Sequence, residues 1–300
     1  MNSRPGFLAR FMRMHVAVVG FAVFGVILVA CVAAPLIAPA PPDAINLDTA
    51  LKAPSLHHPF GTDPFGRDVL SRVVHGARIS LGVGFLARTI SLIIGLVLGA
   101  IAGYFGGKLD ALLMRLADIT FAYPTLLLLI AVIAVLSPGI VSLFVTLGVV
   151  GWASVARLVR AQVLSVKERE FVQAARASGA GHANLLVRHI LPQCLAPVLV
   201  IYTLGLGMTI MAESSLSFLG LGVQPPAPSW GSMVSGGIAF MRVAPWLAFF
   251  PGLFLTLTVC SLNLIGDGLR DALNPRTAAP APALVAPATG SGGPAVRKGH

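Results

Sequence analysis

Charged residues are scarce in this sequence. Asp, Glu, Lys and Arg make up only 11% of its 300 residues, whereas roughly a quarter of the residues in a soluble domain are charged. Hydrophobic residues account for 56%, and the mean hydropathy is +0.86. This composition excludes an ordinary soluble domain and indicates an integral membrane protein. The net charge of +10 does not indicate nucleic-acid binding, because the basic residues lie between apolar segments and not on one basic, aromatic-containing surface.

Cysteines and catalytic motifs are also sparse. The three cysteines, Cys31, Cys194 and Cys260, all lie in apolar segments, which predicts small buried side chains and no disulfide. No G-x-x-x-x-G-K-[ST], G-x-S-x-G or H-E-x-x-H pattern occurs. The fragment GGKL at 106–109 lacks the first glycine and the Ser/Thr of a phosphate-binding loop. A membrane enzyme is therefore disfavoured, since the sequence contains no catalytic cluster.

Histidine offers the only candidate metal ligands. His57 and His58 precede a proline, and His75 stands apart from them. Solvated histidines are the simpler interpretation, so we expect no metal site and no cofactor in this chain. A protein of this kind that moves a solute uphill must take its energy from a partner or from an ion gradient.

Six apolar runs are long enough to cross a membrane, whose ~30 Å hydrocarbon core requires roughly 20 helical residues. Gly95, Gly99 and Gly103 lie on one face of the second run, a spacing that lets another helix approach closely, although glycine is also common in membrane helices generally. The runs predict an all-α, polytopic membrane protein with six transmembrane helices, at about 16–38, 79–105, 116–136, 140–163, 193–217 and 243–266.

The distribution of Lys and Arg predicts the orientation. With the N-terminus inside, most basic residues fall in the inner segments, so the positive-inside rule places both termini in the cytoplasm. The N-terminus also resembles a signal peptide, and LVAC at 28–31 resembles a lipoprotein cleavage site. The apolar run continues to Ile37, however, beyond the usual core of roughly 7–15 residues, which favours an uncleaved first helix.

These assignments divide the chain into five parts. The last part is rich in Ala, Pro and Gly and is expected to be disordered from about residue 277. The parts are a cytoplasmic N-terminal segment at 1–15, the first transmembrane helix at 16–38, an extracytoplasmic loop at 39–78, a core of five transmembrane helices at 79–267 with a cytoplasmic loop at 164–192, and a cytoplasmic tail at 268–300.

Ionisable residues within the spans are candidates for the translocation path, because such residues are costly in a membrane unless they are paired or hydrated. The candidates are Arg88, Glu213 and the adjacent Ser214, whereas Asp118 and Asp267 lie near the cytoplasmic ends of their spans. We expect Glu213 to face the path or a partner subunit. These ionisable residues are scattered and do not form a chain of Asp, Glu and His, so they would make a poor proton relay. A proton-coupled secondary transporter of small solutes is therefore kept as the alternative function.

The loop at 164–192 is polar and basic between two apolar spans. Its helical spacing places Phe171, Ala174, Ala175 and Ser178 on one face. Gly179 and Gly181 are expected to end this helix at positive φ, and a second short helix is expected from His182 to Pro192. A helix lying on the membrane is the alternative, but a face of alanine and serine suits contact with protein better than contact with lipid.

Within this loop, QAARASG followed by HILP resembles the EAA loop of ABC importer permeases. Five residues match that pattern in register, while Gln173 replaces the motif glutamate and His189 replaces an isoleucine. In the family this loop docks in a cleft of the ATP-hydrolysing subunit. The resemblance implies that the docking residues are Glu170, Phe171, Gln173, Ala174, Ala175, Ser178, Gly179, Leu191 and Pro192.

Longer segments resemble the dipeptide/oligopeptide/nickel branch of these permeases, specifically its C-type subunit. They are HPFGTDPFGRDVLSRVVHGARISL, ESSLSFLGLGVQPPAPSWG and NLIGDGLRDALNPR. The resemblance implies a type I importer transmembrane domain in the inner membrane, with membrane lipid around it. It also implies a second homologous permease, two ATPase subunits that bind ATP and Mg, an extracytoplasmic solute-binding protein and a peptide-like substrate. Dipeptides, longer peptides, glutathione, nickel chelates and opines all remain open.

Overall fold

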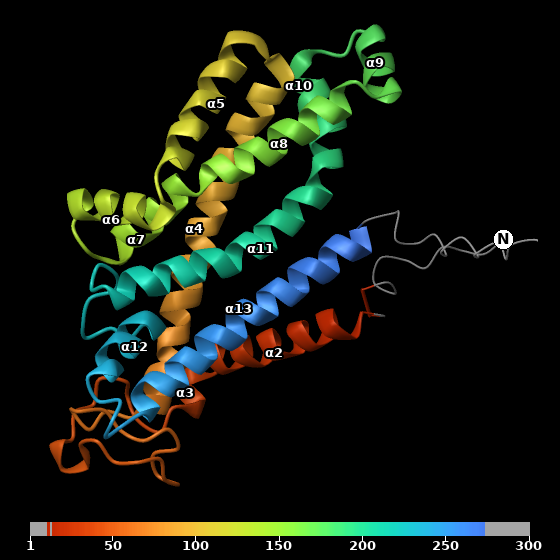
Figure 1. The fold of residues 1–300 in the computed structure, drawn as a ribbon. Helices are drawn as coiled ribbons and strands as arrows, with labels where there is room; N and C mark the ends of the chain where they lie inside the picture. Colours follow the sequence, from red (N-terminus) through yellow and green to blue (C-terminus); the bar gives the residue numbers. More distant parts are fainter. Residues whose placement is uncertain (1–10, 13, 274–300) are drawn as a thin grey trace, which may run out of the picture.

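The computed structural model describes residues 11–12 and 14–273, and this part of the chain contains no strand. Long helices run side by side and short helices lie at the two ends (Figure 1). The helices are α2 (His15–Val32), α3 (Ala34–Ile37), α4 (Val69–Phe105), α5 (Gly107–Ala122), α6 (Thr125–Leu136), α7 (Ile140–Val150), α8 (Trp152–Lys167), α9 (Glu170–Ala177), α10 (His182–Asn184), α11 (Leu191–Phe218), α12 (Trp230–Ile238) and α13 (Trp246–Leu273), with a 3₁₀ turn η1 (Leu47–Thr49) and a π-helical segment η2 (Leu185–Ile190).

The predicted all-α, membrane-spanning architecture is confirmed. Among the described residues, five helical segments are long and apolar enough to cross a membrane, and a sixth span is completed if α5 and α6 are counted as one broken span. The five are α2, α4, α7 with α8, the continuous segment from α10 to α11, and α13.

The third predicted span, 116–136, is wrong as a single straight helix. α5 and α6 meet at an angle of 95°. Pro124 causes the break, because it lacks an N–H and because its ring restricts the residue before it to extended conformations. Tyr123 accordingly has φ −107° and ψ 145°. The apolar run therefore turns sideways near its middle and leads into the short helix α7.

α4 and α13 extend beyond their predicted limits. α4 begins at Val69, ten residues before the predicted start at 79, because Asp68 caps its N-terminus by accepting a hydrogen bond from the Ser71 N–H at 2.7 Å. α13 continues to Leu273, so the first residues assigned to the tail belong to this helix. The predicted disorder from about residue 277 lies outside the described residues.

The glycine stripe of α4 packs against α8. A Cβ atom placed at Gly95 would lie 2.5 Å from Val155 Cβ, and one at Gly99 would lie within 2.5 Å of the Ala156 carbonyl oxygen. At Gly103, the backbone oxygen of Arg160 would lie 2.8 Å away. Such distances exclude any side chain, so the three glycines set the contact between α4 and α8 along most of the C-terminal half of α4.

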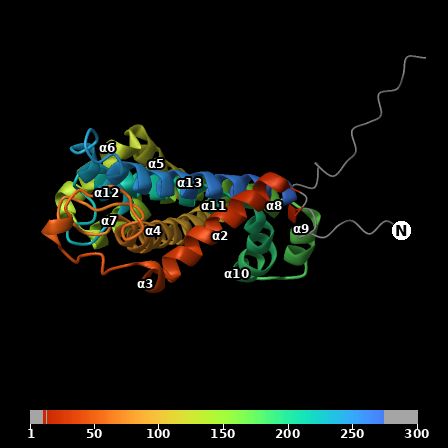
Figure 2. The same ribbon diagram turned by 90° about the horizontal axis from the view of Figure 1, so that it is seen from below.

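Different segments form the two ends of the bundle. The segment 39–68, α3 and α12 gather at one end, while α9 and α10 lie at the other (Figures 1 and 2). α2 and α13 lie side by side along the flank of the bundle in both views. Cys31 and Cys194 are buried as predicted, but Cys260 is exposed on α13, so the prediction of burial is wrong for this residue.

Candidate functional site

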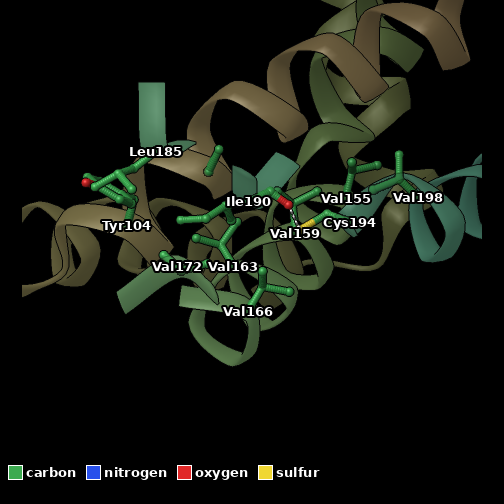
Figure 3. Packing of buried hydrophobic residues seen from close by; sticks show 11 residues of the cluster. Tyr104, Val155, Val159, Val163, Val166, Val172, Leu185, Ile190, Cys194 and Val198 are labelled. Atoms are coloured by element: carbon green, nitrogen blue, oxygen red, sulfur yellow. Dashed lines mark hydrogen bonds between the residues drawn. The ribbon is translucent and has the colours of Figure 1, made fainter. Parts of the chain in front are cut away.

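A valine-rich cluster holds the loop 164–192 against the bundle (Figure 3). Val172 is the buried residue of α9 and has no exposed surface. It belongs to a cluster whose other members come from α4, α8, η2 and α11. The buried members of this cluster are Ala100, Tyr104, Val155, Val159, Val163, Val166, Val172, Leu185, Ile190, Cys194 and Val198.

The opposite side of α9 is open. Phe171 is 43% exposed, and Ala174 and Ser178 are also exposed on the same face of the helix. Ala175 was predicted to share this face, but it is partly buried against the valine-rich cluster. Glu170 is exposed at the N-terminus of α9. The exposed face of α9 therefore carries one aromatic ring followed by two small side chains.

Gly179 ends α9 in the manner predicted. Its φ is +85°, and no atom lies within 4 Å of the position that a Cβ would occupy. Its N–H donates to the Arg176 carbonyl at 3.0 Å, and the Ala180 N–H donates to the Ala175 carbonyl at 3.1 Å. Gly181 has φ −67°, so the prediction of a positive φ at this second glycine is wrong. A single left-handed residue is sufficient to reverse the chain here.

The segment after Gly181 is one continuous helix and not a separate short one. α10 passes through η2 into α11 without a break, so the predicted stop at Pro192 is wrong. Pro192 is the second residue of α11, directly after the π-helical segment η2, and Leu191 is the first residue of α11. His182, at the start of α10, contacts the hydroxyl of Tyr104 through Nδ1 at 2.8 Å and so ties the loop to α4.

Gln173 occupies the position of the motif glutamate and contacts its own loop. Its Nε2 donates to the Lys167 carbonyl at 3.2 Å and lies 3.5 Å from an oxygen of Glu168. Lys167 in turn donates through Nζ to the Gly103 carbonyl at 3.1 Å. The amide of Gln173 thus closes the turn between α8 and α9, a contact for which a carboxylate would lack the donor.

Two ion pairs join α5 to α8 near the same end of the molecule. Arg160 binds Asp110 through two hydrogen bonds of 2.5 and 2.6 Å, in the two-pronged geometry that arginine makes with a carboxylate. Arg157 pairs with Asp118, and both of these side chains are about half exposed. Asp118 therefore belongs to a contact between helices near the inner end.

Arg88 lies between α4 and α11 and is only 5% exposed. Its Nη2 donates to the Ile201 carbonyl at 2.5 Å and its Nε to the Tyr202 carbonyl at 3.4 Å. Gly205 provides the space, since a Cβ there would lie 2.1 Å from the guanidinium carbon. Among the described residues, no ion pair joins Arg88 to Glu213.

Glu213 and Ser214 lie on α11 near the outer end. Glu213 has no exposed surface, and its carboxylate accepts hydrogen bonds from the hydroxyls of Ser217 at 2.7 Å and Ser214 at 3.2 Å. The expectation that Glu213 faces the path or a partner does not agree with this burial, because its contacts are made inside its own chain. Ser214 was predicted together with Glu213, but Ser217 was not, although it stands in the same ESSLS segment.

Two of the histidines considered as metal ligands contact other groups of the protein. His58 contacts Asp68 through Nδ1 at 2.9 Å, and His75 contacts the Ser71 carbonyl at 2.8 Å. Within residues 11–12 and 14–273, no three His, Cys, Asp or Glu side chains gather in the arrangement of a metal site.

A helical bundle with several candidate membrane spans and a short exposed helix between two of them defines a class, the polytopic α-helical membrane proteins. Comparison with known families identifies the group within that class. Residues 95–279 match the family described as binding-protein-dependent transport system inner membrane component, and residues 6–54 match the N-terminal transmembrane domain of oligopeptide transport permease C. The chain belongs to this family and is a multi-pass permease of the ABC importer type in the inner membrane.

Curated relatives agree with this assignment. The chain is 44% identical over 260 residues to the dipeptide transport system permease protein DppC of Alkalihalophilus pseudofirmus, covering 87% of this chain and 86% of the relative. It is 40% identical to the oligopeptide transport system permease protein OppC of Bacillus subtilis, covering 90% and 88%. It is 42% identical to the glutathione transport system permease protein GsiD of Pectobacterium atrosepticum, covering 90% of each.

The fold is also found in a solved structure. A chain of the MetNI methionine ABC transporter, determined in inward-facing conformations, superposes with a TM-score of 0.56 at 20% identity. The match covers 68% of this chain and 97% of the other. At this identity the likeness concerns the fold alone, and it confirms the predicted architecture of an importer transmembrane domain.

Proposed function

We propose that this chain is the permease subunit of an ATP-driven importer that moves peptides or related small solutes, and that the loop 164–192 couples it to separate ATPase subunits. The observation that carries the proposal is the open face of α9. Phe171, Ala174 and Ser178 lie there, at the end of the bundle opposite to the segment 39–68. The rest of the loop is fixed by the valine-rich cluster, so α9 presents this face in a defined orientation.

The composition of this face favours a protein partner over a lipid surface. Small side chains let a second backbone approach, and the aromatic ring of Phe171 supplies an apolar anchor of the kind found at the centre of interfaces. A helix that binds a membrane surface carries large apolar residues along its buried side. Ala174 and Ser178 do not provide such a surface.

The proposed assembly contains a second homologous permease, two ATPase subunits and an extracytoplasmic solute-binding protein. The positive-inside rule supports placing α9 and both termini in the cytoplasm. The segment 39–68 then lies on the extracytoplasmic side of the membrane. Its residues Leu47, Leu56 and Phe65 are 69%, 100% and 51% exposed. Apolar side chains exposed to water outside the membrane are the expected contact surface for a soluble partner such as the solute-binding protein.

The energy for transport is proposed to come from ATP bound with Mg by the partner subunits. Closure of the ATPases would pull the α9 helices of the two permeases toward one another. The valine-rich cluster would carry that movement into α4, α8 and α11, because a tightly packed core transmits displacement. The path would then switch between inward-facing and outward-facing states.

The alternative of proton-coupled transport has less support. A proton relay requires ionisable groups within reach of one another along the path. Arg88 is held by two backbone carbonyls and Glu213 by serines of its own helix, so neither residue continues a chain of ionisable groups. The names of the relatives support a peptide-like substrate, with dipeptides, oligopeptides and glutathione as the candidates.

The test is ATP-driven uptake of a dipeptide, an oligopeptide and glutathione by the complete complex in liposomes. Ala174→Arg places bulk and charge on the open face of α9 and should lower uptake at least tenfold, with loss of ATPase co-purification or of the link between hydrolysis and uptake. Ala183→Arg is the matched control, since Ala183 is exposed on α10 outside that face. Equal uptake and ATPase binding in the two variants would contradict the docking role of α9.

A further inference from the structure

A cavity lies beside the outer part of α11. It has a volume of about 300 Å³, is open on one side, and is lined by residues of α6, α11, α12 and α13. Its walls are mainly apolar, with Met211 and Phe218 from α11 and Val234 from α12. Ser214 and Gly231 form the part of the wall where α11 and α12 meet. A cavity of this size is large enough for an amino-acid side chain, so the contact between α11 and α12 determines the shape of a space that a peptide can enter.

That contact is a close approach of two backbones. A Cβ atom at Gly231 would lie 2.2 Å from the Ser214 carbonyl oxygen. The loop before α12 is equally close to α11, because a Cβ at Gly222 would lie 2.0 Å from the Ser217 hydroxyl. The two glycines make the approach possible but contribute no attraction of their own. The force that holds α12 in place must come from neighbouring groups.

Glu213 lies directly behind this wall. Its two carboxylate oxygens accept hydrogen bonds from Ser217 and Ser214, and Ser80 of α4 provides a third hydroxyl beside the carboxylate. Among the described residues no Lys, Arg or His pairs with it. A buried carboxylate surrounded by hydroxyls and without a cation is costly, which indicates that its hydrogen bonds serve a purpose beyond packing.

The same hydroxyls reach α12 and its loop. The Ser217 hydroxyl also accepts from the Val223 N–H at 3.4 Å, and the Ser80 hydroxyl accepts from the Trp230 N–H at 3.3 Å. The Trp230 ring adds a bond from Nε1 to the Val73 carbonyl of α4 at 3.0 Å. The carboxylate thus accepts from the Ser217 hydroxyl, which holds the Val223 N–H, and lies beside the Ser80 hydroxyl, which holds the Trp230 N–H.

We propose that Glu213 is a positioning residue for transport. Through Ser217 and Ser80 it holds the loop 219–229 and α12 against α11 and α4, and so maintains the wall of the outer cavity through which the solute passes. The role in transport rests on the proposed function. The role in holding the wall does not, because it follows from contacts within this chain.

The test measures the wall and the transport separately. A single cysteine at Val234, in a chain whose native cysteines are replaced by alanine, reports access to the cavity through its rate of reaction with a water-soluble maleimide. Glu213→Leu should raise this rate at least fivefold, and in the complete complex in liposomes it should lower the maximal uptake rate at least tenfold. The half-saturating concentration of solute-loaded binding protein should stay within twofold, because the outer docking surface is unchanged.

Two further variants separate positioning from general loss of stability. Glu213→Gln keeps an amide oxygen that accepts a serine hydroxyl, so it should restore uptake to within threefold of the original chain. Thr258→Val is the matched control, since the Thr258 hydroxyl is buried on α13 without a hydrogen-bond partner among the described residues. It should change neither the labelling rate nor uptake.

Equal labelling and uptake in Glu213→Leu and Thr258→Val would overturn the proposal. If Glu213→Leu does not accumulate in the membrane, Ser217→Ala decides the matter: a labelling rate raised about threefold supports the role and an unchanged rate contradicts it. Absence of ATP-dependent uptake by the unmodified complex would count against the proposed function alone, because the labelling experiment would still report on the wall.

Discussion

The two ends of this molecule, which in the proposed orientation are the outer end at the segment 39–68 and the inner end at α9, differ in how their polar groups are satisfied. At the outer end, Asp68 accepts hydrogen bonds from the backbone N–H and the hydroxyl of Ser71 and also contacts His58. Asp63 accepts from two backbone N–H groups and from the side chain of Arg67. Both carboxylates are buried. The buried carboxylates of the outer end therefore find all these partners within a single chain.

The inner end, by contrast, leaves most of α9 exposed. α9 has one buried residue, Val172, and its charged and small side chains are exposed. Buried, hydrogen-bonded carboxylates hold the outer end together, whereas most of α9 at the inner end is exposed. The two ends should therefore respond differently to substitution. Changes at the outer end should lower the stability of the whole chain, whereas changes at α9 should lower coupling and leave the bundle folded.

The largest effect is expected from Asp68→Ala. This change removes the cap of α4 and leaves the Ser71 N–H and hydroxyl without their acceptor, at a cost of about 2–3 kcal/mol. Thermal unfolding in detergent, followed by circular dichroism, should show a lower Tm. Asn46→Ala is the control, since Asn46 caps the short turn η1 at an exposed site, where the loss should be about 0.5 kcal/mol. Equal shifts of Tm would show that the outer end is not held by its buried carboxylates.

An intermediate effect is expected from Val172→Ala at the inner end. Loss of two methyl groups from the valine-rich cluster should weaken the attachment of α9 by about 2 kcal/mol. Uptake should fall several-fold and hydrogen exchange in α9 should become faster, while the Tm of the bundle stays nearly constant. Phe171→Ala should leave hydrogen exchange unchanged, because this side chain is half exposed. A fall in Tm as large as that of Asp68→Ala would remove the distinction between the two ends.

The smallest effect is expected from the pair Gly179→Ala and Gly181→Ala. Alanine at Gly179 must adopt a φ near +85°, at a local cost of about 1 kcal/mol. Alanine at Gly181 keeps a φ of −67° and should be tolerated. Uptake should therefore fall about twofold to threefold for the first variant and stay unchanged for the second. Identical behaviour of the two variants would argue against a required left-handed residue at the end of α9.

The sequence predicted the spans and the loop well because both depend on local patterns. Apolar runs of sufficient length, the glycine stripe of α4 and the turn at Gly179 each follow from residues close together in the chain. The break at Pro124 was missed because proline is common within membrane helices and usually bends them less. The early start of α4 at Asp68 was missed because hydropathy does not register a helix cap.

The candidate path residues were harder to assign. Charge and depth identified Glu213 and Arg88, but sequence does not show which way a side chain in a membrane helix points. The structure turns Glu213 toward Ser80, a residue more than a hundred positions away on α4, and sets Arg88 against Gly205. Contacts of this kind depend on how helices pack, and no local pattern specifies them. The same holds for Ala175, which shares a helical face with Ala174 by spacing but packs inward.

The length of α4 has a mechanical consequence. At 1.5 Å per residue, this 37-residue helix is about 55 Å long. It is clamped to α8 by its glycines at one end and bonded to Trp230 through Ser80 at the other. α4 is therefore a single helix that connects the two ends of the bundle and is long enough to cross a membrane. A tilt of about 5° would displace its far end by about 5 Å over that length. In the proposed transport cycle, a small rotation of α4 near the loop 164–192 would thus become a movement at its far end comparable to the width of a side chain.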